Sequence, residues 1–199
     1  MGKGENFERE ISRFLSLWLT DGKRDDIIWR KRVRRTNKTP NAEFQLGDIK
    51  AEDAIAIPFT DLFSVELKTG YSRSKNKKGI RNTPWDLLDV IDHTSTLSRK
   101  KEYNPTIIEF WEQTFRDSCI SEKKPLLIFK RDYHIPVVCT SKEVYLSLIF
   151  YCGDYVFDYS TLHFKSYVLY FFTMIDFFEW LTPDIIAIIN RSNNLIHQN

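Results

Sequence analysis

Cysteine is scarce in this 199-residue sequence, and its three cysteines stand far apart at Cys119, Cys139 and Cys152. No CxxC pair occurs, which argues against a disulfide framework and against a structural zinc site. We expect these residues to be buried thiols in a reducing compartment.

The sequence also lacks an apolar leader and any long apolar run without charges. Its most apolar stretch, Val168 to Ile189, is interrupted by Asp176, Glu179 and Asp184. A membrane-spanning helix needs about 20 mostly apolar residues. We therefore expect a cytoplasmic protein with no membrane-spanning segment.

Two common catalytic signatures are missing as well. There is no glycine-rich phosphate loop, so ATP hydrolysis has no support, and there is no Ser-His-Asp signature. The four histidines show no metal-ligand spacing. These absences direct attention to carboxylates and lysines as the candidate catalytic groups.

Excess charge is lacking too, because the net charge is only +2, but the basic residues are unevenly distributed. One basic run lies between residues 23 and 35 and a second between residues 73 and 81. Such runs are either solvated surface or phosphate-binding segments. As nucleic-acid contacts we predict Arg30, Lys31, Arg32, Arg34, Arg35, Arg73 and Lys75.

Hydrophobic periodicity predicts an α/β fold with a small mixed sheet. Apolar residues at three- and four-residue spacing predict helices, and alternation or short apolar runs predict strands. We expect helices over 5–19, 84–91, 105–115, 141–150 and 177–181, and strands over 27–33, 63–67, 125–129 and 135–139. The aromatic stretch 151–172 suits strands, and residues after Arg191 are expected to form a frayed polar tail.

Two carboxylates and a lysine form the most informative constellation. Glu66 and Lys68 are two residues apart in a predicted strand, so their side chains project from the same face. Asp48 follows Gly47 at the edge of another extended segment. Hard divalent cations prefer oxygen ligands, and cleavage of a phosphodiester requires that negative charge be neutralised. Asp48, Glu66 and the Leu67 carbonyl are candidate metal ligands, and Lys68 is placed to orient the attacking water.

This arrangement resembles the PD-(D/E)xK nuclease superfamily, with the restriction-endonuclease-like fold. The matching residues are Asp48, Glu66, Leu67 and Lys68. The N-terminal pattern Lys3-Gly4-x-x-x-Glu8-Arg9-Glu10 looks like the opening helix of archaeal Holliday-junction resolvases. That resemblance implies that Glu8 reaches the metal site. A glutamine on a later helix often joins such sites, and Gln113 is the nearest candidate.

The resemblance implies a nuclease core over residues 1–140 and an aromatic-rich α/β extension over 141–199, packed together as one compact domain. Two features depart from the family pattern. Gly47 stands where the family has proline, and the gap from Asp48 to Glu66 is longer than a tight hairpin needs. Asp53 or Asp61 therefore remains an alternative to Asp48 as the metal ligand.

The implied function is hydrolysis of DNA by an endonuclease that uses Mg²⁺ or Mn²⁺. A phage or restriction-type nuclease is one version. A junction resolvase is another, and it would need a homodimer to place two sites on opposed strands. The alternative is a non-catalytic nucleic-acid-binding module that retains the nuclease fold, and metal-dependent cleavage separates the two hypotheses.

Overall fold

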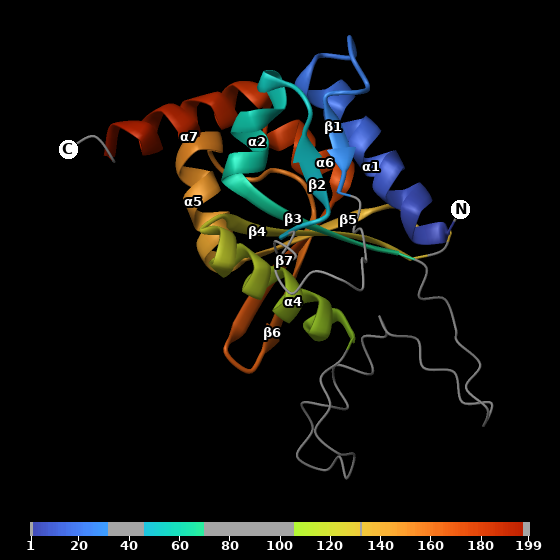
Figure 1. Cartoon of the computed structure of the whole chain (residues 1–199). Helices are drawn as coiled ribbons and strands as arrows, with labels where there is room; N and C mark the ends of the chain where they lie inside the picture. The colour runs from blue at the N-terminus through green and yellow to red at the C-terminus, as the bar shows by residue number, and fades with distance from the viewer. Residues whose placement is uncertain (1, 32–45, 70–105, 132, 197–199) are drawn as a thin grey trace, which may run out of the picture.

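The computed structural model describes residues 2–31, 46–69, 106–131 and 133–196 (Figure 1). In chain order, its elements are α1 (Lys3–Leu19), β1 (Ile28–Arg30), β2 (Ile49–Ala51), η1 (Ala54–Ala56), α2 (Ile57–Leu62), β3 (Phe63–Thr69), α4 (Thr106–Ser121), β4 (Lys124–Lys130), β5 (Val137–Ser141), α5 (Lys142–Cys152), β6 (Tyr159–Phe164), β7 (Tyr167–Thr173), α6 (Met174–Trp180) and α7 (Pro183–Ile196).

The principal sheet has the strand order β3-β4-β5-β7-β6 in the described part of the chain. Strands β3 and β4 run parallel, and the other neighbours run antiparallel. Parallel neighbours need a crossover connection, and α4 lies in it. The mixed sheet flanked by helices confirms the predicted α/β class.

Helices cover both faces of this sheet (Figure 1). Helices α1, α2, α5, α6 and α7 share one apolar core with Val65, Leu67, Leu126 and Ile128 of the central strands. Helix α4 covers the opposite face and packs against a second core that includes Leu127. Alternate strand residues therefore enter different cores, as the two-residue period of a strand requires.

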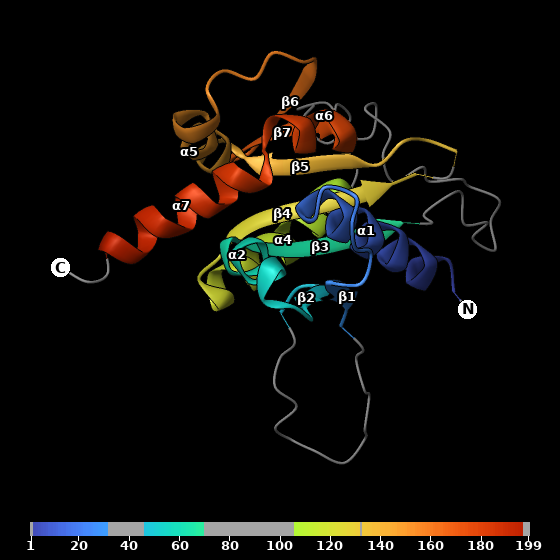
Figure 2. The ribbon, with the colours of Figure 1, turned by 90° about the horizontal axis from the view of Figure 1, so that it is seen from above.

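A short hairpin of β1 and β2 lies outside the principal sheet, beside the outer side of β3 (Figure 2). Its two strands are antiparallel, with Trp29 opposite Lys50. The hairpin is held to α1 by a buried hydrogen bond of 2.9 Å from the Ile28 amide to Ser16 Oγ. It brings the Gly47-Asp48 segment to the free edge of β3.

Local sequence signals account for most of these elements. Phe7, Ile11 and Leu15 recur every four residues and form the buried face of α1. Ser141 caps α5 by accepting a hydrogen bond from the Val144 amide, as its position ahead of an apolar run predicts. The expected strand of residues 63–67 is β3, which extends to Thr69. The predicted helix over residues 84–91 lies outside the described residues.

Several aromatic residues of the C-terminal half pack inside the protein. Tyr155, Phe172 and Trp180 are all at least 90% buried, and the rings of Tyr155 and Phe172 lie 4.8 Å apart. Strand β7 pairs with β5 and so belongs to the principal sheet. Tyr155, Phe172 and Trp180 are therefore part of the core.

One local prediction was wrong. The residues after Arg191 were expected to form a frayed tail, but α7 runs to Ile196. It packs through Ile186 and Ile189, and Asn190 donates a 2.9 Å hydrogen bond to the Pro58 carbonyl of α2. Pro58 lies in the first turn of α2, where its missing amide is harmless.

Within the described residues, no helix is long and apolar enough to cross a membrane.

Candidate active site

Asp48 is held between β1 and β3 by its own backbone. Its carbonyl accepts a 2.8 Å hydrogen bond from the Lys31 amide, and its amide donates one of 2.8 Å to the Val65 carbonyl. Its carboxylate oxygen Oδ2 accepts a 2.7 Å hydrogen bond from the Leu67 amide. Both the backbone and the side chain of Asp48 are therefore fixed against the edge of β3.

Gly47 explains why this chain lacks the family's proline. Its φ is +73°, a conformation that glycine adopts freely, whereas proline is locked near −65°. An added Cβ would also lie 3.1 Å from the Val65 carbonyl oxygen. Only glycine combines this backbone turn with such close approach to β3, so the substitution is part of how Asp48 is positioned.

Glu66 and Lys68 lie on the face of β3 that α4 covers. The Glu66 residue is only 3% exposed, although it is a charged residue type. The Lys68 ammonium donates a hydrogen bond to Glu66 Oε1 and lies 5.6 Å from the centre of the Phe110 ring. The predicted projection of both side chains to one spot is confirmed.

Helix α4 contributes a polar stripe to the same site. Gln113 Nε2 donates a 2.7 Å hydrogen bond to Glu66 Oε1. Phe110, Gln113 and Asp117 are three and four residues apart and so lie on one side of the helix. The structure therefore brings Gln113 to Glu66, and it adds Asp117, one helical turn further along.

Burial and crowding of negative charge govern the protonation of the carboxylates. Burial, followed by the charge of Asp48, raises the pKa of Glu66 to about 7, although the ammonium of Lys68 opposes the shift. Burial also raises the pKa of Asp48, against the lowering effects of the Leu67 amide and Lys68. The charge of Asp117 raises the pKa of both residues. The site thus holds more negative than positive charge.

Glu8, on α1, lies close enough to Asp48 for their charges to interact. Its pKa is raised first by burial and then by the charge of Asp48, while Arg30 lowers it. Arg30 pairs with Glu5 at 3.1 Å and with Glu8 at 3.4 Å, and its side chain is only 11% exposed. Arg30 was predicted to contact nucleic acid, but the structure engages its guanidinium with these two glutamates.

The other predicted nucleic-acid contacts are only partly described. Lys31 is half-buried and donates a hydrogen bond to the Leu46 carbonyl. Outside the described residues lie Arg32, Arg34, Arg35, Arg73 and Lys75.

The two alternative acids have different surroundings from Asp48. Asp53 caps η1 through a 3.0 Å hydrogen bond from the Ile55 amide, and it pairs with Arg24 at 2.5 Å. Asp61 has a largely exposed side chain whose carboxylate lies 3.6 Å from the Lys123 ammonium. The negative charge of Asp48 has the largest charge effect on the pKa of Glu66, which favours Asp48 as its partner.

A divalent cation would meet a suitable donor set at this site. Val65 accepts from the Asp48 amide and Leu67 donates to the Asp48 carboxylate, so odd residues of β3 turn their backbone polar groups toward Asp48. The Leu67 carbonyl therefore faces the same edge. Among the residues that the structure describes, no three His, Cys, Asp or Glu side chains form a metal-holding group. The candidate set is instead two carboxylates and one backbone carbonyl, all oxygen donors.

Sequence reasoning missed Asp117. The available signal was its spacing of four residues from Gln113 on a helix with apolar residues on the remaining inner positions. A polar residue one turn after a candidate site residue faces the same neighbour. The signal became interpretable only once α4 was known to cover Glu66.

Comparison with known proteins gives one match. Residues 92–187 match the model of a family described as "Phage putative PDDEXK endonuclease". No curated protein and no solved structure matches the chain.

The match and the motif lie in different parts of the chain. The matched residues include Gln113, Asp117 and the aromatic C-terminal strands, whereas Asp48, Glu66 and Lys68 precede them. The motif and the match therefore point to the same superfamily independently. The match supports the resemblance of this chain to the PD-(D/E)xK nucleases.

Proposed function

We propose that this protein is a metal-dependent endonuclease that hydrolyses DNA phosphodiester bonds. One observation carries the proposal: Asp48 and the buried Glu66 meet at the edge of β3, with Lys68 and Gln113 bound to Glu66. A desolvated pair of carboxylates is unfavourable for folding unless a function requires it. The family match supports nuclease activity in general.

Three ligands would hold the cation in this proposal: the carboxylates of Asp48 and Glu66 and the carbonyl of Leu67. A bound Mg²⁺ or Mn²⁺ would neutralise phosphate charge and lower the pKa of an attacking water. The hydrogen bond from the Leu67 amide fixes the Asp48 carboxylate, so the ligand is oriented before any ion arrives.

Lys68 provides the positive charge at the reaction centre. Its ammonium has three donors, and one is used on Glu66. The remaining two can orient the attacking water and contact a phosphate oxygen. Gln113 holds Glu66 from the other side, and so acts as a positioning residue rather than a group that touches substrate.

A cleavage assay tests the proposal. Purified protein is incubated with supercoiled plasmid, linear duplex and a four-way junction, with Mg²⁺, with Mn²⁺ or with chelator. We expect cutting only with a metal ion, and loss of cutting in Lys68→Ala. Lys130→Ala is the matched control, because Lys130 lies on β4 and pairs with Glu10 at 2.9 Å. Preference for the junction, together with a dimer in solution, would identify a resolvase.

Asp48→Asn is the second variant. The amide keeps an oxygen that can accept from the Leu67 amide but loses the negative charge, so folding should persist while cleavage falls on the order of 10³-fold. DNA binding measured in chelator should be unchanged or tighter, because phosphate repulsion falls. Normal cutting by Asp48→Asn would overturn the assignment. DNA binding with no cutting of any substrate by the wild-type protein would favour the non-catalytic binding module.

A further inference from the structure

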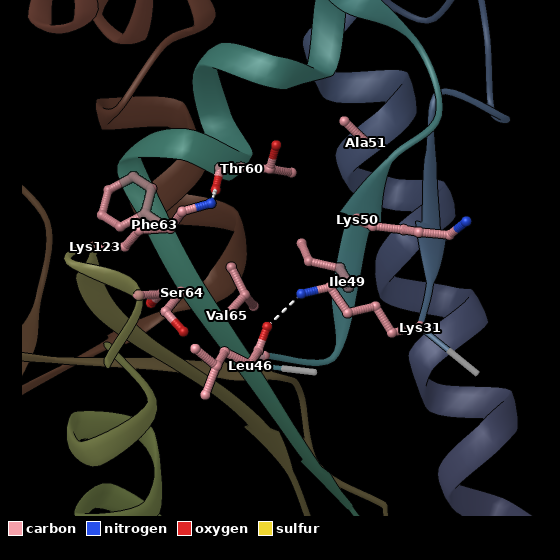
Figure 3. Close-up of a pocket in the computed structure, with 12 residues that line it drawn as sticks. Lys31, Leu46, Ile49, Lys50, Ala51, Thr60, Phe63, Ser64, Val65 and Lys123 are labelled. Carbon is pink, nitrogen blue, oxygen red and sulfur yellow. Dashed lines mark hydrogen bonds between the residues drawn. The ribbon is translucent and has the colours of Figure 1, made fainter. Parts of the chain in front are cut away.

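A pocket of about 390 Å³ lies next to the candidate active site (Figure 3). It opens between β2, the start of β3 and the turn after α4. We call it the lysine pocket and define it by Lys31, Gly47, Ser64, Ser121 and Lys123, which are among its lining residues. Figure 3 shows the ammonium groups of Lys31 and Lys123 at separate parts of its wall.

The lysine pocket continues two rows of residues that begin in the active site. On β3, Ser64 precedes Glu66 by two residues and so shares its face. On α4, Ser121 follows Asp117 by four residues and extends the same stripe. Gly47, which positions Asp48, forms part of the pocket wall. The pocket therefore adjoins the candidate active site, two residues earlier along β3.

The pocket is positively charged, in contrast to the acidic site beside it. Lys31 donates to the Leu46 carbonyl and Lys123 donates to the Thr60 carbonyl at 2.5 Å. Each ammonium has three donors, so both retain hydrogen-bonding capacity after these contacts. The carboxylate of Asp61 lies 3.6 Å from the Lys123 ammonium, but its side chain is 61% exposed. Solvent therefore screens its attraction to Lys123, and it neutralises little of the pocket's positive charge.

Lys31 and Lys123 also repel each other. The pKa of Lys31 is lowered by burial and then by the positive charge of Lys123. Two ammonium groups that repel each other in one pocket gain most from an anion that lies between them. Ser64 and Ser121 supply hydroxyl groups at the border with the acidic site.

We propose that the lysine pocket binds the phosphate of the DNA strand that is adjacent to the scissile phosphate. Two strand residues span roughly 7 Å, which matches the step between neighbouring phosphates along one nucleic-acid strand. The volume admits a phosphate with its sugar. The proposal rests on the proposed function, because it takes the scissile phosphate to lie at Asp48, Glu66 and Lys68.

Binding in chelator tests the pocket without any need for cleavage. The probe is a fluorescent DNA oligonucleotide, and anisotropy is measured for wild-type protein, Lys31→Gln, Lys123→Gln and the double variant. We expect roughly tenfold weaker binding for each single variant at low salt. The slope of log affinity against log salt should fall by about one for each lysine removed.

The matched control is Lys124→Gln. Lys124 adjoins Lys123 in sequence and carries the same charge, but it donates to Ser147 Oγ at 3.2 Å and does not line the pocket. Equal weakening by Lys124→Gln and Lys123→Gln would overturn the proposal, because it would reveal a non-specific charge effect. Lys123→Arg restores the charge and should restore binding. Thermal melting checks that each variant is folded.

A neutral phosphate locates the contact. A methylphosphonate is placed at each position of the oligonucleotide in turn, and one position should weaken wild-type binding much more than its neighbours. In the double variant, that same position should have no further effect, as a double-mutant cycle requires. If the double variant still cleaves DNA and shows the same methylphosphonate profile as the wild-type protein, phosphate binding in the pocket would be wrong and the nuclease proposal would remain. If the wild-type protein cuts no substrate but the methylphosphonate effect still depends on the two lysines, the proposed nuclease activity would be wrong and phosphate binding in the pocket would remain supported.

Discussion

Strands β3 and β4 are parallel neighbours whose residues pair one to one, yet of the two only β3 carries residues of the candidate active site. On the face toward α1, both strands are apolar, with Val65 beside Leu126 and Leu67 beside Ile128. On the face toward α4 they differ. The polar residues of β3 lie beside apolar residues of β4, in the pairs Ser64–Pro125, Glu66–Leu127 and Lys68–Phe129.

The difference follows from position in the sheet. Strand β4 lies between β3 and β5, and on this face Leu127 packs in an apolar core with Cys139 of β5. Strand β3 is an edge strand of the principal sheet, and its outer neighbour is the Gly47-Asp48 segment. Of these two strands, β3 can hold buried charge, because its position at the edge of the sheet leaves it polar partners and access to substrate.

The largest expected effect comes from placing the same residue at two paired positions. Leu127 is fully buried, and Leu127→Gln should lower the free energy of unfolding by about 4 kcal/mol, because it removes apolar packing and buries an amide. Glu66→Gln should change it by less than about 1 kcal/mol, because it removes a desolvated charge and keeps the shape. Urea denaturation in chelator measures both. Equal losses would show that Glu66 is a structural residue.

The next expected effect is on pH dependence. The folded pKa of Glu66, about 7, is above its ordinary value of 4.5, so the folded state binds more protons than the unfolded state between these values. Stability without metal should therefore fall as pH rises from about 4.5 to about 7, and should be level above that range. In Glu66→Gln, the decrease in stability over this pH range should be much smaller. The comparison uses urea midpoints measured across the pH range. An identical slope in both proteins would remove Glu66 as its source.

Gly47 gives a smaller effect with an internal control. Gly22 and Gly47 have similar φ values of +77° and +73°, but an added Cβ has open space at Gly22 and crowds Val65 at Gly47. Both alanine variants should lose about 1 kcal/mol of stability from backbone strain. Gly47→Ala should lose roughly a further 1 kcal/mol from crowding, and it alone should lower cleavage. Matched stability losses and unaffected cleavage would show that the close approach is unimportant.

The smallest expected effect is at Gln113. Gln113→Leu removes the 2.7 Å hydrogen bond to Glu66 and leaves the lysine contact in place, so kcat should fall roughly tenfold with KM little changed. Glu112→Leu is the control on the same helix, because Glu112 is displaced from the polar stripe. A rise in KM alone would instead place Gln113 in substrate binding.

The elements that could be predicted from the sequence are those with a local signal. Periodicity and caps specified α1, β3, β4, β5 and α5, because each signal lies within the element itself. Helix α7 was missed because the apolar residues from β7 through α7 run together with few breaking residues between them. Its stability comes from contacts with distant elements such as α2, which no local pattern contains.

The candidate site also contains residues that local geometry predicts and residues that depend on contacts between distant segments. Glu66 and Lys68 could be paired from sequence because strand geometry places them together. The choice among Asp48, Asp53 and Asp61 depended on the path from β2 to β3. That path holds η1 and α2 rather than a tight hairpin, which explains its length. Asp117 enters through packing of α4 on β3, a contact between segments far apart in the chain.

The hydrogen bond from the Leu67 amide to Asp48 has a consequence for self-association. Exposed backbone groups on an edge strand can recruit a strand from another molecule. Asp48 covers two such groups on β3, one with its amide and one with its carboxylate. Its loss would therefore remove a barrier to intermolecular β-pairing as well as a charge. Asp48→Ala should aggregate more readily than Asp48→Asn, because asparagine keeps an acceptor for the Leu67 amide. The residue that we propose as a metal ligand would then also protect the edge of β3 from polymerisation.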